Sequence, residues 1–419
     1  MDKAAWQPRD DTRDAFRIHI CPNAILGFGV FLALVFVSYQ GRSGVLIFLV
    51  MGMLLVMRRV DFALRDIREY WWLCLLPLWA IVSAMWSEHH SLSLRHGTQL
   101  LITFVIAISL ANRLSPVLLL RMLFFALLIA GVASLLIGEV RADGIWIGIF
   151  ESKNYYAFTM VTLVLSSFAF VVDHRQSLYW RLAGLAGLAL GLPQMVMAES
   201  VGAMIASIVV FVVAVILLRT SSLPPARRQA SFVALLCLTL AGVLAAFYFW
   251  NAITELLFEV TGKDPSLTGR TDLWTIALAE IARAPLLGTG YRAFWVEGNS
   301  AAEALWTEYY IGSRSGFNFH NLYLSNAVEI GVVGVAAQVL LLASAFLLCV
   351  RWLVQTGGAP AMFFFMVVSF VIVLSLVEVP VFFEFDTLSV VTLASLVYGL
   401  RAAREVPQPL RFQSAAWPG

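Results

Sequence analysis

Charged residues are scarce in this 419-residue chain: they make up 13% of it, whereas hydrophobic residues make up 60%. A soluble globular domain carries about 25% charged residues. The long apolar runs instead indicate an integral membrane protein built from helices, because backbone groups inside a bilayer must hydrogen-bond to one another. The formal net charge of +2 gives no sign of an acidic partner, and we expect no nucleic-acid partner.

Several signals of common chemistry are also missing. The four cysteines show no CxxC spacing, so neither a disulfide framework nor a metal site is indicated. No P-loop, GxSxG or HExxH pattern occurs. His89, His90 and His96 suggest either metal ligands or a solvated loop, and the lack of a carboxylate-rich pattern beside them favours the loop. We therefore expect no metal.

The apolar runs predict an all-α polytopic membrane protein with about twelve spans. They form transmembrane helices 1–9 within residues 24–250 and helices 10–12 within residues 322–401. A tail, residues 1–23, lacks a short apolar region with a small-residue cleavage site, so it is interpreted as cytosolic and not as a signal peptide. Residues 402–419 form the second tail. The expected segments are 24–39, 44–57, 71–86, 98–111, 116–138, 154–172, 178–195, 201–218, 231–250, 322–350, 361–379 and 385–401.

The distribution of basic residues predicts the orientation. If the N-terminus is cytosolic, roughly two-thirds of the 28 Lys and Arg residues fall on the cytosolic side, as the positive-inside rule requires. Both termini are then cytosolic, and residues 251–321 form one large loop outside, in the periplasm of a Gram-negative cell. Loops of this length are usually functional.

Polar residues concentrate between Thr268 and Glu329. Within this stretch the apolar spacing predicts a helix from Thr271 to Arg283. Arg270 would then lie just before the helix, where backbone N–H groups and a guanidinium can together hold an anion. His320 and Asn321 would open the tenth membrane helix.

Arginines on the outer side suggest phosphate binding. Arg270, Arg292 and Arg314 can each hold a phosphate oxygen pair by bidentate hydrogen bonds. The alternative is structural: each arginine pairs with an acid of the same loop. The available acids are Asp264, Asp272, Glu297 and Glu308.

His320 suits a general base. The helix dipole disfavours an imidazolium at a helix N-terminus, so a neutral ring there can accept a proton. The alternative is a capping residue hydrogen-bonded to the loop.

Two smaller outer sites are less specific. Lys153 and Asn154 either add to the same polar face or mark the point where the sixth helix leaves the interface. Glu199 either acts as an acid or is simply solvated at the membrane boundary, and Ser200 follows it.

Two motifs carry a resemblance to a known family. They are Gly269-Arg270-Thr271-Asp272-Leu273-Trp274 and Phe319-His320-Asn321-Leu322-Tyr323-Leu324. With Gly288-Thr289-Gly290-Tyr291 and Glu329-Ile330-Gly331 they resemble the O-antigen ligase / Wzy-type polymerase superfamily of bacterial membrane glycosyltransferases. Trp86-Ser87, Ser93-Leu94-Arg95 and the stretch from Gly290 to Trp295 look most like the exopolysaccharide-polymerase branch. The resemblance covers residues 71–398.

The resemblance implies a donor glycan on undecaprenyl diphosphate and a glycan acceptor whose hydroxyl attacks the anomeric carbon. Arg270 would hold the diphosphate and His320 would activate the hydroxyl. Arg292, Arg314, Lys153, Asn154, Asn321, Glu199, Ser200 and Arg95 are the expected substrate contacts. Diphosphate is a good leaving group once its charge is matched, so we expect no cofactor. One departure is Val201, which stands where the family often has a basic residue after the serine.

Three interpretations remain at this point. The first is a polymerase of exopolysaccharide repeat units in the inner membrane, with a chain-length regulator and export machinery as further partners. The second is an O-antigen ligase that transfers the same donor to lipid A core. The third is a transporter of polysaccharide or lipid, which should carry ionisable residues near the bilayer midplane. The centres of the expected spans are nearly free of charge, which favours the enzymes.

The orientation can be tested with fused reporters. A reporter inserted at Gly298 should score as periplasmic and one at Ala226 as cytosolic, because the charge distribution places these two residues on opposite sides. Opposite results at both positions would reverse the topology and move the expected site to the cytosol.

Overall fold

The computed structural model describes residues 21–221, 227 and 268–404. The first half contains α1 (Pro22–Val35), α2 (Val37–Gln40), α3 (Arg42–Met57), α4 (Val60–Tyr70), α5 (Leu75–Val82), α6 (His90–Arg113), α7 (Pro116–Ile137), α8 (Lys153–Val172), α9 (Leu178–Met197) and α10 (Val201–Ser221). The second half contains α13 (Thr268–Arg283), α14 (Ser300–Glu308), α15 (Leu322–Thr356), α16 (Ala359–Leu374) and α17 (Thr387–Arg404). The ninth expected span, residues 231–250, lies outside the described residues.

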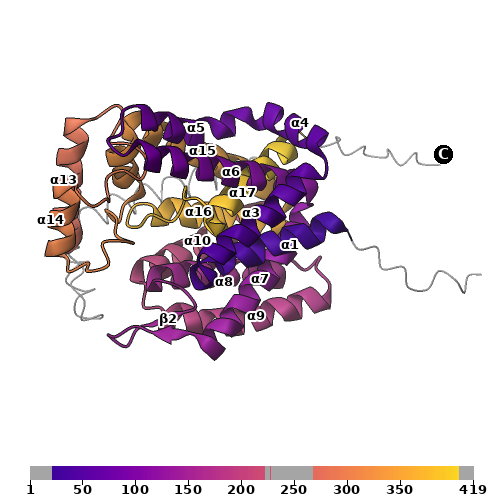
Figure 1. The fold of residues 1–419 in the computed structure, drawn as a ribbon. Helices are drawn as coiled ribbons and strands as arrows, with labels where there is room; N and C mark the ends of the chain where they lie inside the picture. Colours follow the sequence, from indigo (N-terminus) through magenta and orange to yellow (C-terminus); the bar gives the residue numbers. More distant parts are fainter. Residues whose placement is uncertain (1–20, 222–226, 228–267, 405–419) are drawn as a thin grey trace, which may run out of the picture.

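These helices pack side by side into a bundle (Figure 1). Helix α6 packs against α5 and α17, α15 packs against α16 and α17, and α8 packs against α9. In the described part of the chain α6, α7, α8 and α15 are long and apolar enough to cross a membrane, and α1, α3, α10 and α16 are shorter apolar helices. The protein is therefore a mostly helical, multi-pass membrane protein.

Helices α13 and α14 lie together at one end of the bundle (Figure 1). We call this the loop end; α6, α8, α15 and α17 begin there. A small apolar core holds it together, separate from the core of the bundle: its members include Leu273, Phe294, Leu305, Trp306 and Phe319. The loop end is therefore a packed unit with its own interior.

The structure corrects three local predictions. Residues 71–86 do not form one helix: α5 is flanked by 3-10 turns at Trp71–Cys74 and Ser83–Met85. Residues 87–97, between the third and fourth expected spans, are not all loop, because α6 begins at His90 and contains His96. Residues 139–153, between the fifth and sixth expected spans, are not only loop, since a short antiparallel hairpin pairs β1 (Glu139–Val140) with β2 (Trp146–Gly148).

Helix α15 is interrupted at Gly331, where φ is 67° and ψ is −179°. The break frees carbonyl groups that other segments bind. The N–H of Thr289 donates to Val328 O at 2.9 Å, that of Gly290 to Glu329 O at 2.7 Å, and Trp79 Nε1 to Ile330 O at 2.9 Å. The N–H of Val332 donates to Pro285 O at 2.9 Å. The interruption thus joins α5, the segment after α13 and α15 at one place.

Gly331 is required at this break. Its backbone conformation is nearly exclusive to glycine, and a Cβ there would collide with Leu286 O.

We expect Gly331→Ala to lower thermal stability strongly, since the backbone strain of about 1–3 kcal/mol adds to a main-chain clash. The measurement is the midpoint of thermal unfolding in detergent. Gly312→Ala is the matched control, because a Cβ at Gly312 meets no atom within 4 Å. A Gly331→Ala protein as stable as the control would contradict this account of the break.

Candidate active site

A single carboxylate joins the two residues expected to be catalytic. Arg270 NH2 donates to Glu378 Oε1 at 2.6 Å, and His320 Nδ1 lies 2.9 Å from Glu378 Oε2. The side chains of Arg270 and His320 are 27% and 25% exposed, whereas that of Glu378 is 7% exposed. We call these three residues the first triad. The guanidinium of Arg270 and the imidazole of His320 are both open to a ligand, and the acid between them is buried.

Helix α13 explains why the Arg and Trp of the first motif are four residues apart. Residues at i and i+4 share one face of a helix, and Arg270 reaches Glu378 while Trp274 Nε1 donates to Phe319 O at 2.9 Å. The same face of α13 therefore binds Phe319, the residue before His320, and Glu378, the acid that binds His320. The helix begins at Thr268, so Arg270 lies in its first turn and not before it, which corrects the prediction.

The backbone around His320 is constrained. His320 has φ 47°, in the left-handed region, and its N–H donates to Asn318 Oδ1 at 2.7 Å. Asn321 is the N-cap of α15: its Oδ1 accepts from the N–H groups of Tyr323 and Leu324, both at 3.0 Å. Its amide nitrogen donates to Leu376 O at 3.0 Å. Asn321, expected as a substrate contact, is therefore occupied in holding α15 and the residues after α16.

Glu378 lies in the segment between α16 and α17, residues 375–386, which we call the α16–α17 loop. The sequence prediction ran the eleventh span through residue 379 and gave this acid no role. A signal was present: the stretch EVPVFFEFD places three acids among apolar residues, and an ionisable group in such a setting is a candidate functional residue. All three acids, Glu378, Glu384 and Asp386, are bound by residues from other elements.

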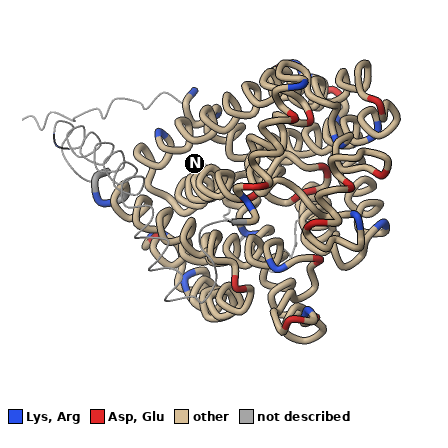
Figure 2. The backbone as a smooth tube through the Cα atoms, turned by 90° about the vertical axis from the view of Figure 1, so that its left-hand side faces the viewer, with Lys and Arg blue, Asp and Glu red and all other residues tan. Residues whose placement is uncertain are grey.

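Glu384 forms a second constellation of the same composition. Its Oε1 accepts from Arg292 NH2 at 3.1 Å and lies 2.8 Å from His96 Nδ1. Its Oε2 accepts from Tyr291 Oη at 3.3 Å. We call Arg292, Glu384 and His96 the second triad. Figure 2 views the loop end and shows basic and acidic residues next to one another across it.

Charge pairing keeps Glu384 ionised. Burial raises the pKa of its carboxyl, but the Arg292 charge and the His96 hydrogen bond outweigh burial and lower the pKa to about 2. Burial likewise lowers the pKa of Arg292, and the Glu384 charge reverses this and raises the pKa above its ordinary value. At neutral pH the second triad therefore contains a carboxylate and a guanidinium.

The other expected contacts are more dispersed. Arg314 is exposed and lies 3.8 Å from Glu297 Oε1, as the structural interpretation anticipated. Ser200 donates to Asn154 Oδ1 at 3.1 Å, which brings the beginnings of α8 and α10 together. Lys153 is the first residue of α8, Glu199 has φ 47° at the join between α9 and α10, and Arg95 is exposed on α6.

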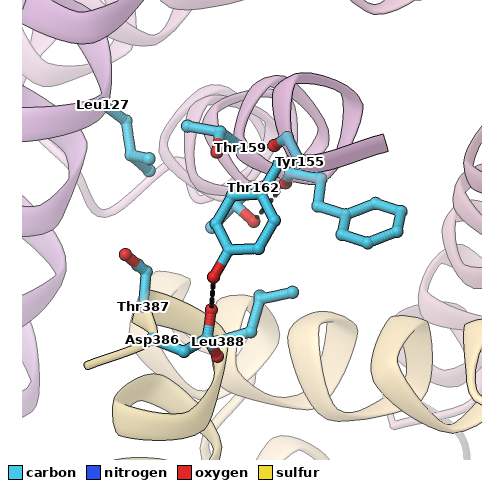
Figure 3. Close-up of a pocket in the computed structure, with 8 residues that line it drawn as sticks. Leu127, Tyr155, Thr159, Thr162, Asp386, Thr387 and Leu388 are labelled. Carbon is cyan, nitrogen blue, oxygen red and sulfur yellow. Dashed lines mark hydrogen bonds between the residues drawn. The ribbon is translucent and has the colours of Figure 1, made fainter. Parts of the chain in front are cut away.

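The third acid of the α16–α17 loop borders a small pocket (Figure 3). Tyr155 Oη donates to Asp386 Oδ1 at 2.6 Å, and the N–H of Ser389 donates to Asp386 Oδ2 at 2.6 Å. Leu127, Thr159 and Leu388 complete much of the lining. Asp386 therefore anchors the end of the loop to α8 and caps the start of α17.

The residues that the structure describes contain no group of three or more His, Cys, Asp or Glu side chains placed to hold a metal ion. His90 Nδ1 contacts Ala84 O and His96 belongs to the second triad. The interpretation of His96 as part of a solvated loop was wrong, because the residue is in a helix and pairs with Glu384.

The first triad has the parts of an acid–base site with an anion contact. An ionised Glu378 only accepts hydrogen bonds, so a neutral His320 bound to it would carry its proton on Nδ1 and present Nε2 as an acceptor. The guanidinium of Arg270 supplies a permanent positive charge beside it. Such a pair can take a proton from a hydroxyl group while it stabilises a departing anion.

Comparison with known proteins identifies the family of the chain. Residues 186–339 match the family model described as O-antigen ligase. The chain is also 30% identical over 410 residues, 95% of its length and 92% of the relative's length, to the exopolysaccharide production protein ExoQ of Rhizobium meliloti (strain 1021). These matches define a membrane enzyme of the glycan polymerase or ligase type. The chain belongs to the O-antigen ligase / Wzy-type polymerase superfamily.

Proposed function

We propose that this protein polymerises oligosaccharide repeat units carried on undecaprenyl diphosphate, on the periplasmic side of the inner membrane. The observation that carries the proposal is the link through Glu378 between Arg270 and His320. This link supports the proposal because it brings a guanidinium, which can bind an anion, and an imidazole, which can accept a proton, to one point at the loop end. The similarity to an exopolysaccharide production protein supports the polymerase over a ligase that uses lipid A core as acceptor.

The reaction follows from the two exposed groups. A hydroxyl of the acceptor glycan attacks the anomeric carbon of the donor, and its proton passes to His320 Nε2. The bond between the anomeric carbon and the phosphate oxygen breaks, and the diphosphate leaves with the bonding electrons. Arg270 matches the charge of the leaving group by bidentate hydrogen bonds. These steps account for every bond and proton without a metal ion, and we propose a metal-independent reaction.

Glu378 has two tasks in this scheme. It holds the ring of His320 in the tautomer that leaves Nε2 free, and it offsets the positive charge that appears on the ring after proton transfer. Through its other oxygen it fixes the position of Arg270 relative to the base. An incoming diphosphate must therefore share or replace Glu378 at the guanidinium.

A deletion strain tests the function directly. Loss of all long glycan chains with single lipid-linked repeats retained is the result expected for a polymerase. Accumulation of lipid-linked polymer together with bare lipid A core would identify a ligase instead. Normal glycans of normal length would remove both enzymes from consideration.

Arg270 is expected to be essential. Arg270→Ala should abolish transfer, and Arg270→Lys should remain badly impaired, since a lysine keeps the charge but lacks the planar fork. The measurement is transfer by purified protein with lipid-diphosphate donor, in the presence of a strong chelator. Near-normal transfer by the lysine variant would show that a diffuse positive field is enough. Loss of wild-type activity in the chelator, restored by a divalent ion, would refute the metal-free reaction.

His320 is expected to act in the chemical step. His320→Ala should lower turnover by about 10²–10⁴-fold, the range typical of a positioned base, and leave donor affinity nearly unchanged. If donor affinity collapses while turnover at saturating donor is unchanged, His320 is a binding residue.

A further inference from the structure

The second triad has the same three residue types as the first, although Arg292 and His96 share Oε1 of Glu384 whereas Arg270 and His320 take different oxygens of Glu378. In both, one glutamate carboxylate bridges an arginine NH2 and a histidine Nδ1, and both glutamates come from the α16–α17 loop. The exposures also match: the side chains of Arg292 and His96 are 34% and 25% exposed, and that of Glu384 is 10% exposed. The proposed reaction uses only the first triad, so the second is a constellation of equal accessibility without a role.

The surroundings of the two triads differ. The backbone N–H of Arg292 donates to Glu329 Oε2 at 2.9 Å, so a second carboxyl group lies beside this residue, while Glu384 binds the guanidinium. The guanidinium also lies over the ring of Phe383, with Cζ 4.6 Å from the ring centroid. The charge of Arg292 is already balanced by the ionised Glu384, and the second carboxyl group adds no positive charge, so little is left to attract a diphosphate. The ligand of the second triad should therefore be uncharged.

The donors and acceptors of the second triad suit a sugar. Each sugar hydroxyl both donates and accepts a hydrogen bond, whereas a guanidinium only donates and a carboxylate only accepts. An arginine beside a carboxylate can therefore bind two neighbouring hydroxyl groups in opposite senses. In the described part of the structure the Arg292 Nε–H has no acceptor, so the protein alone does not satisfy this guanidinium.

We propose that the second triad binds an uncharged sugar of the acceptor glycan and so presents the acceptor hydroxyl to His320. This proposal rests on the proposed function, which supplies a glycan acceptor. Glu378 and Glu384 are six residues apart in one loop, so their Cα atoms are separated by at most about 21 Å. A chain of a few sugar rings can span that distance. In this arrangement the first triad binds the donor diphosphate and the second triad binds the acceptor sugar.

The test uses a phosphate-free probe, the oligosaccharide repeat released from the cell's own polymer. Its affinity is measured by titration calorimetry with the full-length protein in lipid nanodiscs. His96→Gln and Glu384→Gln should each weaken binding about tenfold or more, the loss of one hydrogen bond to a charged group. Arg270→Ala should bind the probe as the wild type does, and Arg314→Gln is the surface control. His96→Gln leaves the Arg292–Glu384 pair in place, so it decides the question even if Glu384→Gln fails to fold.

Three results would overturn the proposal. In the first, Arg270→Ala or His320→Ala weakens binding of the probe and neither variant of the second triad does. In the second, every variant binds the probe with equal affinity. In the third, the wild type does not bind the probe at millimolar concentration. The failure of the proposed function has a different signature, because a wild type that binds the probe and transfers no sugar from lipid diphosphate would refute the enzyme and leave the sugar site intact.

Discussion

The arrangement of the loop end depends on a shared carboxylate. Glu378 binds a guanidinium with one oxygen and an imidazole with the other, so Arg270 and His320 keep their relative positions only while this acid is in place. Its position is fixed in turn by contacts before it in the chain, where Leu322 N–H donates to Ser375 O at 3.0 Å, and after it, where Glu384 and Asp386 are bound. Breaking a buried pair of this kind leaves an uncompensated charge, which costs far more than the pair contributes when intact. The α16–α17 loop is therefore as much part of the site as Arg270 on α13 and His320 just before α15.

Sequence reasoning recovered most helices because their length and apolar composition leave few alternatives in a membrane. Helices α7, α8 and α15 begin within a residue of the expected positions. It failed where tertiary contacts override composition. Residues 71–86 are uniformly apolar and suggest one helix, yet Trp79 and Trp86 bind the carbonyls of Ile330 and Leu287, and 3-10 turns adjoin α5 on both sides. The local sequence gives no sign of a hydrogen-bond partner that lies about 200 residues away in the chain.

The residues of the candidate site also fall into those that the sequence indicated and those that it did not. Arg270 and His320 belong to motifs whose spacing reflects local geometry, so the sequence alone pointed to them. Glu378 and Glu384 are single acids in an apolar stretch, and their role becomes apparent only from the residues that the fold brings into contact with them. His96 was misread for the same reason, because its partner lies 288 residues further along the chain. Arg292 was expected either to bind a phosphate or to pair with an acid of its own loop, and its guanidinium pairs with Glu384, an acid of the α16–α17 loop.

The break at Gly331 separates α15 into a short segment next to His320 and a long segment that continues through the bundle. A continuous helix would transmit any tilt along its whole length. Membranes differ in thickness by a few ångströms, and helices respond to such mismatch mainly by tilting. In this protein the short segment is fastened to α5 and to residues 285–290, so a change of tilt in the long segment can be absorbed at the glycine. We therefore expect the geometry around His320 to depend less on the thickness of the bilayer than it would with a continuous helix.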